Sequence, residues 1–272
     1  MQPVTFFEMK FKNKVVWITG ASSGIGEALA YEFTREGAKT ILSSNETEEL
    51  ERVRIKCEEM GGESSVLFLD MLDTQSLGMA VKTAIDRFGG IDILINNAGI
   101  SHRSLVTDTD VEFDRKIMEI DFFSYIILTK NILPYMLERG GGQVAATSSL
   151  SGLFGFPLRS AYSAAKHAVK GYFETMGIEL RDKNIYVTIA YPGRIRTNIS
   201  YHALTSDGKA QGKMDKSLAS GMPVEKCAKI YMNAIYKKKR EVLIGGKEII
   251  IAYIHRFCPW LFWRMVNKVS PV

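Results

Sequence analysis

Tyr162 and Lys166, four residues apart, are the side chains of this sequence best suited to proton chemistry. In a helix, two residues at that spacing share one face and lie about one turn apart. A lysine charge about 4 Å from a phenol is worth roughly 4 kcal/mol at an effective dielectric near 20. Because about 1.4 kcal/mol corresponds to one unit, such a lysine can lower the pKa of a tyrosine from about 10 towards neutrality. The phenol could then exchange a proton with an alcohol or a ketone. The same spacing also occurs in many helices without function, so the rest of the chain must decide.

A glycine-rich turn lies between a predicted strand, residues 14–19, and a predicted helix, residues 27–36. The strand is a short apolar run with many β-branched residues, which is typical of a buried parallel strand. The turn reads Gly20-Ala-Ser-Ser-Gly24-Ile-Gly26. In this arrangement backbone N–H groups and a helix N-terminus can bind the pyrophosphate of a dinucleotide. A tight turn without a ligand is the alternative.

The residues after the second predicted strand, 39–43, determine how the ribose of an adenosine is bound. An acidic residue there favours a free 2′-hydroxyl, and an arginine favours a 2′-phosphate. This chain has Ser43-Ser44-Asn45, which is neither. Because no acid at those positions would repel a phosphate, the sequence favours NADP, with NAD as the alternative.

Short apolar segments and helical patterns alternate along the whole chain, with further strands predicted at residues 65–69, 91–95, 143–147, 185–190 and 241–244. Residues 110–136 are predicted to form one long helical region. This alternation predicts right-handed βαβ crossovers. We therefore expect a single α/β domain spanning residues 1–272, a Rossmann-type doubly wound parallel sheet of about seven strands with helices on both faces. Residues 198–222 are polar and long for a loop, and they are predicted to form a substrate lid.

The composition is ordinary for a soluble globular protein, with 46% hydrophobic and 24% charged residues. The net charge of +5 is too mild to indicate nucleic acid binding. Three widely spaced cysteines show no metal-ligand or disulfide pattern. No signal peptide is visible, and no stretch reaches the about 18 uninterrupted apolar residues of a spanning helix. These features predict a cytoplasmic protein without a metal site.

The C-terminal extension, residues 247–272, is rich in aromatic side chains. Within it, residues 249–266 mix bulky apolar groups with Arg256 and Arg264. This stretch could lie in a membrane interface, which would make the protein peripheral to a membrane. It could also form a subunit contact, cover a pocket for an apolar substrate, or pack as a helix on its own core.

Five motifs in order resemble those of the short-chain dehydrogenase/reductase family. They are Thr19-Gly-Ala-Ser-Ser-Gly-Ile-Gly26, Asn96-Asn-Ala-Gly99, Ser149, Tyr162-x-x-x-Lys166 and Pro192-Gly193. Trp17, Glu51-Arg-Val-Arg54 and the aromatic C-terminus further resemble the dehydrogenase/reductase member 7 branch, which is related to the 11β-hydroxysteroid dehydrogenases.

The resemblance implies an NAD(P)-dependent oxidoreductase that interconverts a secondary alcohol and a ketone, with an apolar, lipid- or steroid-like substrate. It implies that Tyr162 is the general acid/base and that Ser149 binds the substrate oxygen. Lys166 would tune the tyrosine and hold the nicotinamide ribose. It also implies a homodimer or homotetramer. The alternative is a catalytically weak NAD(P)-binding sensor or partner-binding protein.

The resemblance also implies which residues surround the cofactor. From the diphosphate through the adenosine to the nicotinamide end, these are Gly20, Ser22, Ser23, Gly24, Ile25, Ser44, Asn45, Asp70, Met71, Asn97, Ala98, Gly99, Tyr162, Lys166, Pro192, Ile195 and Thr197.

One catalytic position departs from the family pattern. The resemblance places Asp121 where the family usually has an asparagine that anchors a water leading from the lysine to solvent. An ionised aspartate would raise the pKa of Lys166 and offset part of the field that the lysine exerts on Tyr162. We therefore expect a shifted pH optimum. A sequence difference without consequence is the alternative.

Overall fold

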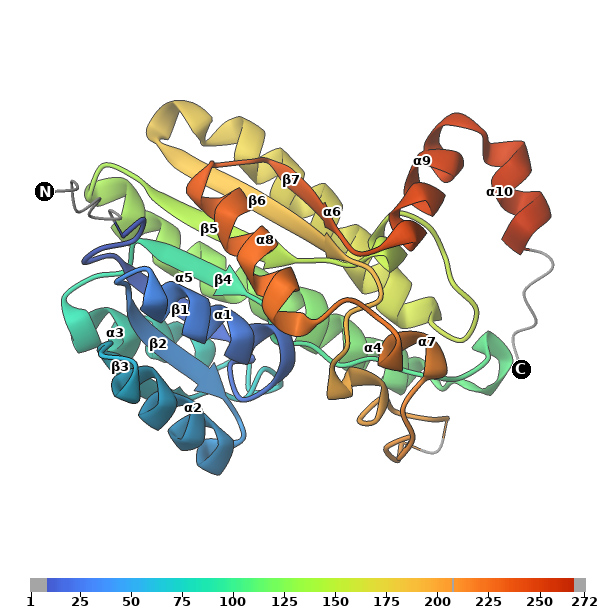
Figure 1. The fold of residues 1–272 in the computed structure, drawn as a ribbon, viewed down its shortest axis with the longest axis horizontal. Coiled ribbons are helices and arrows are strands. Elements are labelled where there is room, and N and C mark those ends of the chain that lie inside the picture. Colours follow the sequence, from blue (N-terminus) through green and yellow to red (C-terminus); the bar gives the residue numbers. More distant parts are fainter. Residues whose placement is uncertain (1–8, 207, 267–272) are drawn as a thin grey trace, which may run out of the picture.

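Seven parallel strands form one sheet in the computed structural model, which describes residues 9–206 and 208–266 (Figure 1). Along the sheet the strands follow the order β3-β2-β1-β4-β5-β6-β7. Their bounds are β1 Val15–Thr19, β2 Lys39–Ser44, β3 Ser64–Phe68, β4 Ile93–Asn96, β5 Gly142–Thr147, β6 Ile185–Pro192 and β7 Glu241–Ile244. The predicted Rossmann-type fold is confirmed.

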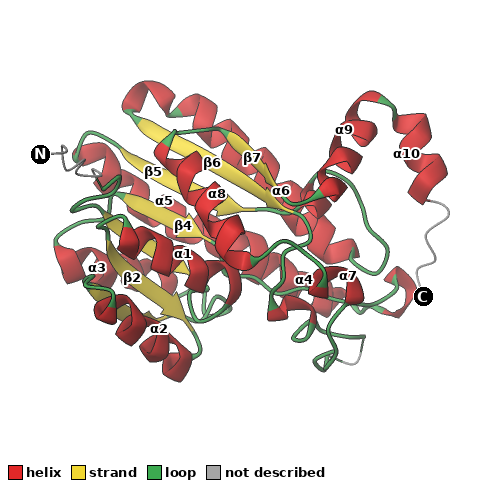
Figure 2. Ribbon diagram, viewed as in Figure 1, coloured by secondary structure: helices red, strands yellow, loops and turns green. Residues whose placement is uncertain are grey.

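Helices cover both faces of this sheet, which gives three layers (Figure 2). Strand β1 shows the reason, because Val16 and Ile18 pack into one core and Val15 and Trp17 into the other. The first core is closed by α1 Gly24–Arg35, α2 Thr47–Glu59 and α8 Val224–Tyr236. The second is closed by α3 Leu77–Phe88, α5 Ser124–Glu138 and α6 Ser160–Glu179.

The order of the strands reverses between β1 and β4, since the chain builds outwards from β1 in one direction and then in the other. In open parallel sheets, ligands bind at such a switch point, outside the carboxyl ends of the strands. The glycine-rich turn after β1, the Asn96-Asn97 turn after β4 and Ser148-Ser149 after β5 all lie at this edge.

The segment predicted as one helical region, residues 110–136, is divided in three. Helix α4, Val111–Met118, leads into a π-helical turn, Glu119–Phe123, and then into α5. In the turn, the Oδ1 atom of Asp121 accepts a hydrogen bond of 2.8 Å from the backbone N–H of Ile100. Such turns insert one residue into a helix and often occur at functional sites. Here the turn directs Asp121 into the protein.

The C-terminal stretch forms two short helices, α9 Ile250–Phe257 and α10 Pro259–Val266, which project from the end of the sheet (Figure 1). Phe262 anchors them, because its ring is buried and lies 5.1 Å from that of Phe154. On the outer side Phe257 and Trp260 are 71% and 67% exposed. Among residues 9–206 and 208–266, no helix is long and apolar enough to span a bilayer.

Candidate active site

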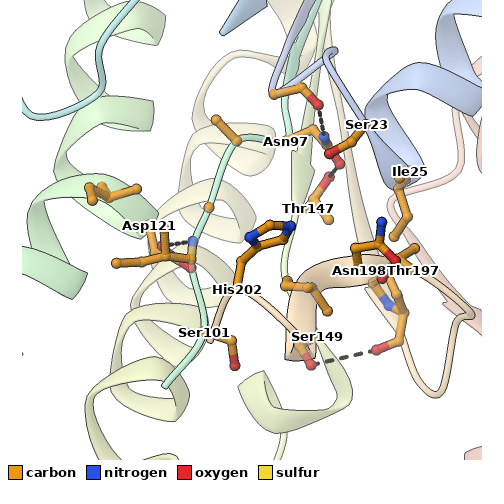
Figure 3. Close-up of a pocket in the computed structure, with 18 of the residues that line it drawn as sticks. Ser23, Ile25, Asn97, Ser101, Asp121, Thr147, Ser149, Thr197, Asn198 and His202 are labelled. Atoms are coloured by element: carbon orange, nitrogen blue, oxygen red, sulfur yellow. Dashed lines mark hydrogen bonds between the residues drawn. The ribbon is translucent and has the colours of Figure 1, made fainter. Parts of the chain in front are cut away.

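A cavity of about 340 Å³ opens at the carboxyl ends of the strands (Figure 3). Every residue that the sequence assigned to catalysis or to the cofactor lines this cavity. Most of these residues belong to turns that are far apart in the sequence, after each of the strands β1 to β6, while Asp121 comes from the π-helical turn and Tyr162 and Lys166 from α6. The strand order explains this convergence, because it brings those turns to a single edge of the sheet.

Tyr162 and Lys166 project from the first two turns of α6 and are both buried. The Nζ atom of Lys166 lies 5.7 Å from the centre of the Tyr162 ring. The same ammonium donates a hydrogen bond of 3.1 Å to the carbonyl of Thr147 and one of 3.5 Å to the hydroxyl of Tyr125. The lysine is therefore fixed beneath the tyrosine by contacts from β5 and α5.

Asp121 forms an ion pair with this lysine, with 3.1 Å between its Oδ2 atom and Nζ of Lys166. Burial lowers the pKa of Lys166, but the attraction of Asp121 outweighs it and the pKa is raised above its ordinary value. Burial raises the pKa of Asp121 against the opposing effect of Lys166. The carboxyl group of Asp121 therefore opposes the charge of Lys166 within the cavity wall.

Ser149 lies on the cavity wall directly after β5. Its Oγ atom accepts a hydrogen bond of 3.1 Å from the backbone N–H of Ser151 and donates one of 3.5 Å to the carbonyl of Pro192. The second contact is long and therefore weak. The hydroxyl can turn from Pro192 towards a ligand oxygen in the cavity.

The glycine-rich turn leaves no room for side chains where it meets the rest of the site. Gly20 has a φ of +64°, and a Cβ atom there would lie 2.7 Å from the Cα atom of Ala98. A Cβ atom on Gly26 would lie 2.0 Å from the carbonyl oxygen of Gly20. The turn therefore packs closely against the turn after β4, and the start of α1 lies at the cavity wall. This cradle fits the pyrophosphate of a dinucleotide.

Asn97 connects this turn to the neighbouring strands. Its Nδ2 atom donates hydrogen bonds to the carbonyls of Thr19 and Gly20, at 3.1 and 3.3 Å. Its Oδ1 atom accepts one of 3.2 Å from Thr147. The amide thereby ties the ends of β1, β4 and β5 together at the cavity (Figure 3).

At the adenosine end the structure adds a residue that the sequence analysis passed over, Glu46. The hydroxyl of Ser22, in the glycine-rich turn, donates a hydrogen bond of 2.6 Å to Oε2 of Glu46. The hydroxyl of Ser44 accepts one of 2.9 Å from the Glu46 backbone N–H. The sequence did contain a signal for this residue, because Glu46 is an acid only two residues beyond the end of β2. The sequence analysis considered residues 43–45 alone.

The opposite end of the cavity carries two further residues that the sequence analysis missed, Arg103 and Arg159. Both form ion pairs with Asp215, with Nη2–Oδ2 distances of 2.7 Å and 3.5 Å. Asp215 belongs to the segment predicted as a lid, residues 198–222, and His202 of the same segment projects into the cavity (Figure 3). Arg103 and Asp215 are 112 residues apart in sequence, and no local pattern indicates their contact.

Comparison with known proteins agrees with this geometry. Residues 14–207 match the family described as short chain dehydrogenase. The chain is 40% identical to "Dehydrogenase/reductase SDR family protein 7-like" of Drosophila melanogaster, covering 97% of this chain and 84% of the relative. It is also 40% identical to "Dehydrogenase/reductase SDR family member 7B" of Mus musculus, covering 94% and 80%.

Among solved structures, a short chain dehydrogenase/reductase from Burkholderia phymatum in complex with NAD superposes with a TM-score of 0.81. It is 22% identical and covers 97% of this chain and 99% of its own, so it supports the fold. The sequence matches establish more than the fold. The chain belongs to the short-chain dehydrogenase/reductase family of oxidoreductases.

Proposed function

We propose that this protein interconverts a secondary alcohol and a ketone with a nicotinamide cofactor, and that Tyr162 transfers the proton. One observation carries the proposal: Tyr162, Lys166 and Ser149 line the same cavity as the glycine-rich turn. A carbonyl bound between Ser149 and Tyr162 would therefore lie within the same enclosure as a dinucleotide held at that turn.

In this reaction the cofactor, Tyr162, Ser149 and Lys166 have separate roles. When bound, the nicotinamide supplies the hydride in reduction and accepts it in oxidation. Tyr162 gives its proton to the carbonyl oxygen in reduction and takes it back in oxidation. Ser149 donates a hydrogen bond to the same oxygen. Because the ammonium of Lys166 is already surrounded by Asp121, Thr147 and Tyr125, the lysine acts on Tyr162 chiefly through its charge.

For the cofactor, we favour NAD over the NADP that the sequence favoured. The carboxylate of Glu46 lines the adenosine end of the cavity and would repel a 2′-phosphate. Arg52 lies nearby, with a hydrogen bond of 3.2 Å to the backbone carbonyl of Ser22, but it is paired with Glu27 and Glu49. Its charge is therefore already balanced. The NAD in the Burkholderia phymatum structure is in line with this choice.

For the substrate, we propose a molecule with an apolar body. Ile199 and Leu218, from the segment 198–222, line the cavity beyond the catalytic residues together with Ile100. A lid of this kind would exclude water from the reacting carbonyl.

The test is the variant Tyr162→Phe, assayed for cofactor oxidation with a panel of ketones. General acid/base catalysis contributes about a hundredfold to ten-thousandfold, so we expect a loss of that size in kcat with cofactor binding retained. Tyr172→Phe is the matched control, because Tyr172 lies on the same helix outside the cavity lining. Equal rates for Tyr162→Phe and the parent protein would overturn the proposal. Cofactor binding without turnover of any ketone would favour the alternative, a sensor or partner-binding protein.

We also propose that α9 and α10 contact the surface of an anionic membrane. Exposed Phe257, Trp260 and Trp263 share these helices with Arg256 and Arg264, a combination that suits the boundary between headgroups and acyl chains. Sedimentation with vesicles of phosphatidylserine and phosphatidylcholine tests this. We expect binding to fall in the double variant Trp260→Ala and Trp263→Ala. Absence of binding at low salt would contradict it.

Assembly into a homodimer or homotetramer and a cytoplasmic location stay predictions. Light scattering during size-exclusion chromatography measures the first, and a monomer at micromolar concentration would contradict it. Imaging of the tagged protein in cells measures the second.

A further inference from the structure

The end of the cavity beyond Tyr162 holds more positive than negative charge. Arg103 and Arg159 line it, and the carboxylate paired with both belongs to Asp215. The Asp121–Lys166 pair on the neighbouring wall is internally balanced. His102 adds no charge near neutral pH, because burial together with Arg103 and Arg159 lowers the pKa of His102 to about 4. Two cations therefore share one anion.

The carboxylate of Asp215 binds mainly to Arg103. Its Oδ2 atom accepts two hydrogen bonds from that guanidinium, at 2.7 Å from Nη2 and 3.2 Å from Nε. The Oδ1 atom accepts one of 3.1 Å from Gln211. The remaining Nη1 of Arg103 donates to Ser101 and to the carbonyl of His102. All three nitrogens of the Arg103 guanidinium thus donate hydrogen bonds, and Arg103 links the 198–222 segment to the loop after β4.

Arg159 makes a long contact of 3.5 Å to the same Oδ2 atom, and its guanidinium carbon lies 5.8 Å from the centre of the Phe156 ring. In the part of the chain that the structure describes, no hydrogen bond to a side chain or carbonyl uses its guanidinium, although its side chain is 24% exposed. Burial and the neighbouring Arg103 lower the pKa of Arg159 from its ordinary value. The charge of Arg159 is therefore poorly compensated within the protein, and a ligand anion would compensate it.

We propose that the substrate carries an oxyanion, a carboxylate or a phosphate, and that Arg159 binds it. This inference rests on the proposed function, since it names a feature of the molecule whose carbonyl Tyr162 reduces. A guanidinium presents two parallel N–H groups that match the two oxygens of either anion. The apolar body expected from Ile199 and Leu218 would then end in a charged group.

The position of Arg159 limits where that group lies. Arg159 is the N-cap of α6 and precedes Tyr162 by three residues. Both side chains line the cavity, so the short separation in sequence keeps them near one another there. Leu158, just before it, has a φ of +63°, which is uncommon for a branched side chain. An anion bound by Arg159 in this cavity would therefore lie close to a carbonyl at Tyr162.

The first test measures binding alone, so it needs no turnover. Calorimetry on the intact protein compares heptanoate and hexyl phosphate with hexanol, because all three carry a hexyl chain and hexanol has no charge. We expect the two anions to bind about tenfold or more tighter than hexanol, and Arg159→Gln to remove that difference. Arg159→Lys keeps the positive charge, so it should keep part of the difference in affinity between the anions and hexanol. Arg87→Gln, an exposed arginine in the last turn of α3, is the control for loss of a positive charge. The anion that binds more tightly identifies the charged group of the substrate as a carboxylate or a phosphate.

The second test measures turnover of levulinate against methyl levulinate, a keto acid and its neutral ester. We expect kcat/KM to favour the acid by about tenfold in the parent protein and to lose that preference in Arg159→Gln. Equal binding of anions and hexanol, with ketones turned over, would overturn the inference and leave the proposed function standing. Anion binding that depends on Arg159, without turnover of any ketone, would support the subsite and overturn the proposed function.

Discussion

Asp121 and Lys166 form a buried ion pair in which the Oδ2 and Nζ atoms lie 3.1 Å apart, and the same Nζ atom lies 5.7 Å from the centre of the Tyr162 ring. A π-helical turn holds the aspartate in place, and the backbone N–H of Ile100 binds its second oxygen at 2.8 Å. The charge that is expected to act on the tyrosine is therefore opposed by another charge in contact with it. This arrangement weakens the field that the lysine exerts on Tyr162.

Replacing Asp121 with asparagine keeps the shape and removes the opposing charge. Because Lys166 would then act on Tyr162 without opposition, we expect the acidic limb of alcohol oxidation to move to lower pH by on the order of one unit. The measurement is kcat/KM for oxidation as a function of pH. Asp110→Asn, exposed at the start of α4, is the control. Superimposable profiles for the parent and Asp121→Asn would remove Asp121 from the mechanism.

Glu46 is expected to set the preference between the two dinucleotides. Its carboxylate lies at the adenosine end of the cavity and binds the hydroxyl of Ser22. We predict that the parent protein binds NADH more tightly than NADPH and that Glu46→Gln narrows the difference by about tenfold. Nicotinamide fluorescence gives both dissociation constants. Glu59→Gln, at the far end of α2, should change neither. Tighter binding of NADPH than of NADH by the parent protein would contradict this prediction and support NADP as the cofactor.

Gly26 should not tolerate even a methyl group. A Cβ atom there would lie 2.0 Å from the carbonyl oxygen of Gly20, so the turn must shift. We expect Gly26→Ala to lower the stability by about 1–3 kcal/mol and to weaken dinucleotide binding. Thermal unfolding with and without NADH measures both effects. Gly171→Ala is the matched change in a helix with open space around it, and it should be neutral or slightly stabilising.

The ion pair of Asp215 predicts how the 198–222 segment responds to acid. Burial acts to raise the pKa of Asp215, but the hydrogen bonds from Arg103 outweigh it and hold the pKa below its ordinary value. For an acid with a lowered pKa, the stabilisation is complete above the unfolded value, about 3.9, and is lost as pH falls below it. We therefore expect the segment to loosen below about pH 4.

Hydrogen–deuterium exchange over the described part of residues 198–222 measures this loosening. Asp215→Asn should show faster exchange at neutral pH as well, because the neutral amide cannot replace the ion pair with Arg103. Asp182→Asn, exposed beyond the end of α6, controls for the change of charge. Unchanged exchange in Asp215→Asn would show that the contact with Arg103 does not hold the segment.

Several elements could be predicted well from local patterns. The seventh strand, Glu241–Ile244, was predicted with its observed bounds, and the other strands agree within two residues. Their apolar runs are short and end in glycine or polar residues, which makes them distinct. The division of residues 110–136 was missed, because the π-helical turn is only five residues long and contains no glycine or proline that would mark it.

The sequence by itself determined the fold class, the glycine-rich turn and the motif of Tyr162 and Lys166, because these depend on short runs of residues read in order. Only the tertiary structure decided which charges meet. Asp121 pairs with Lys166 across 45 residues, Glu46 reaches Ser22, and Asp215 joins Arg103 and Arg159 from the other side of the cavity. The reason is physical. Charges act through space over a few ångströms in a medium of low dielectric. The order of the strands in the sheet brings their connecting turns together and so decides which charges come within that distance.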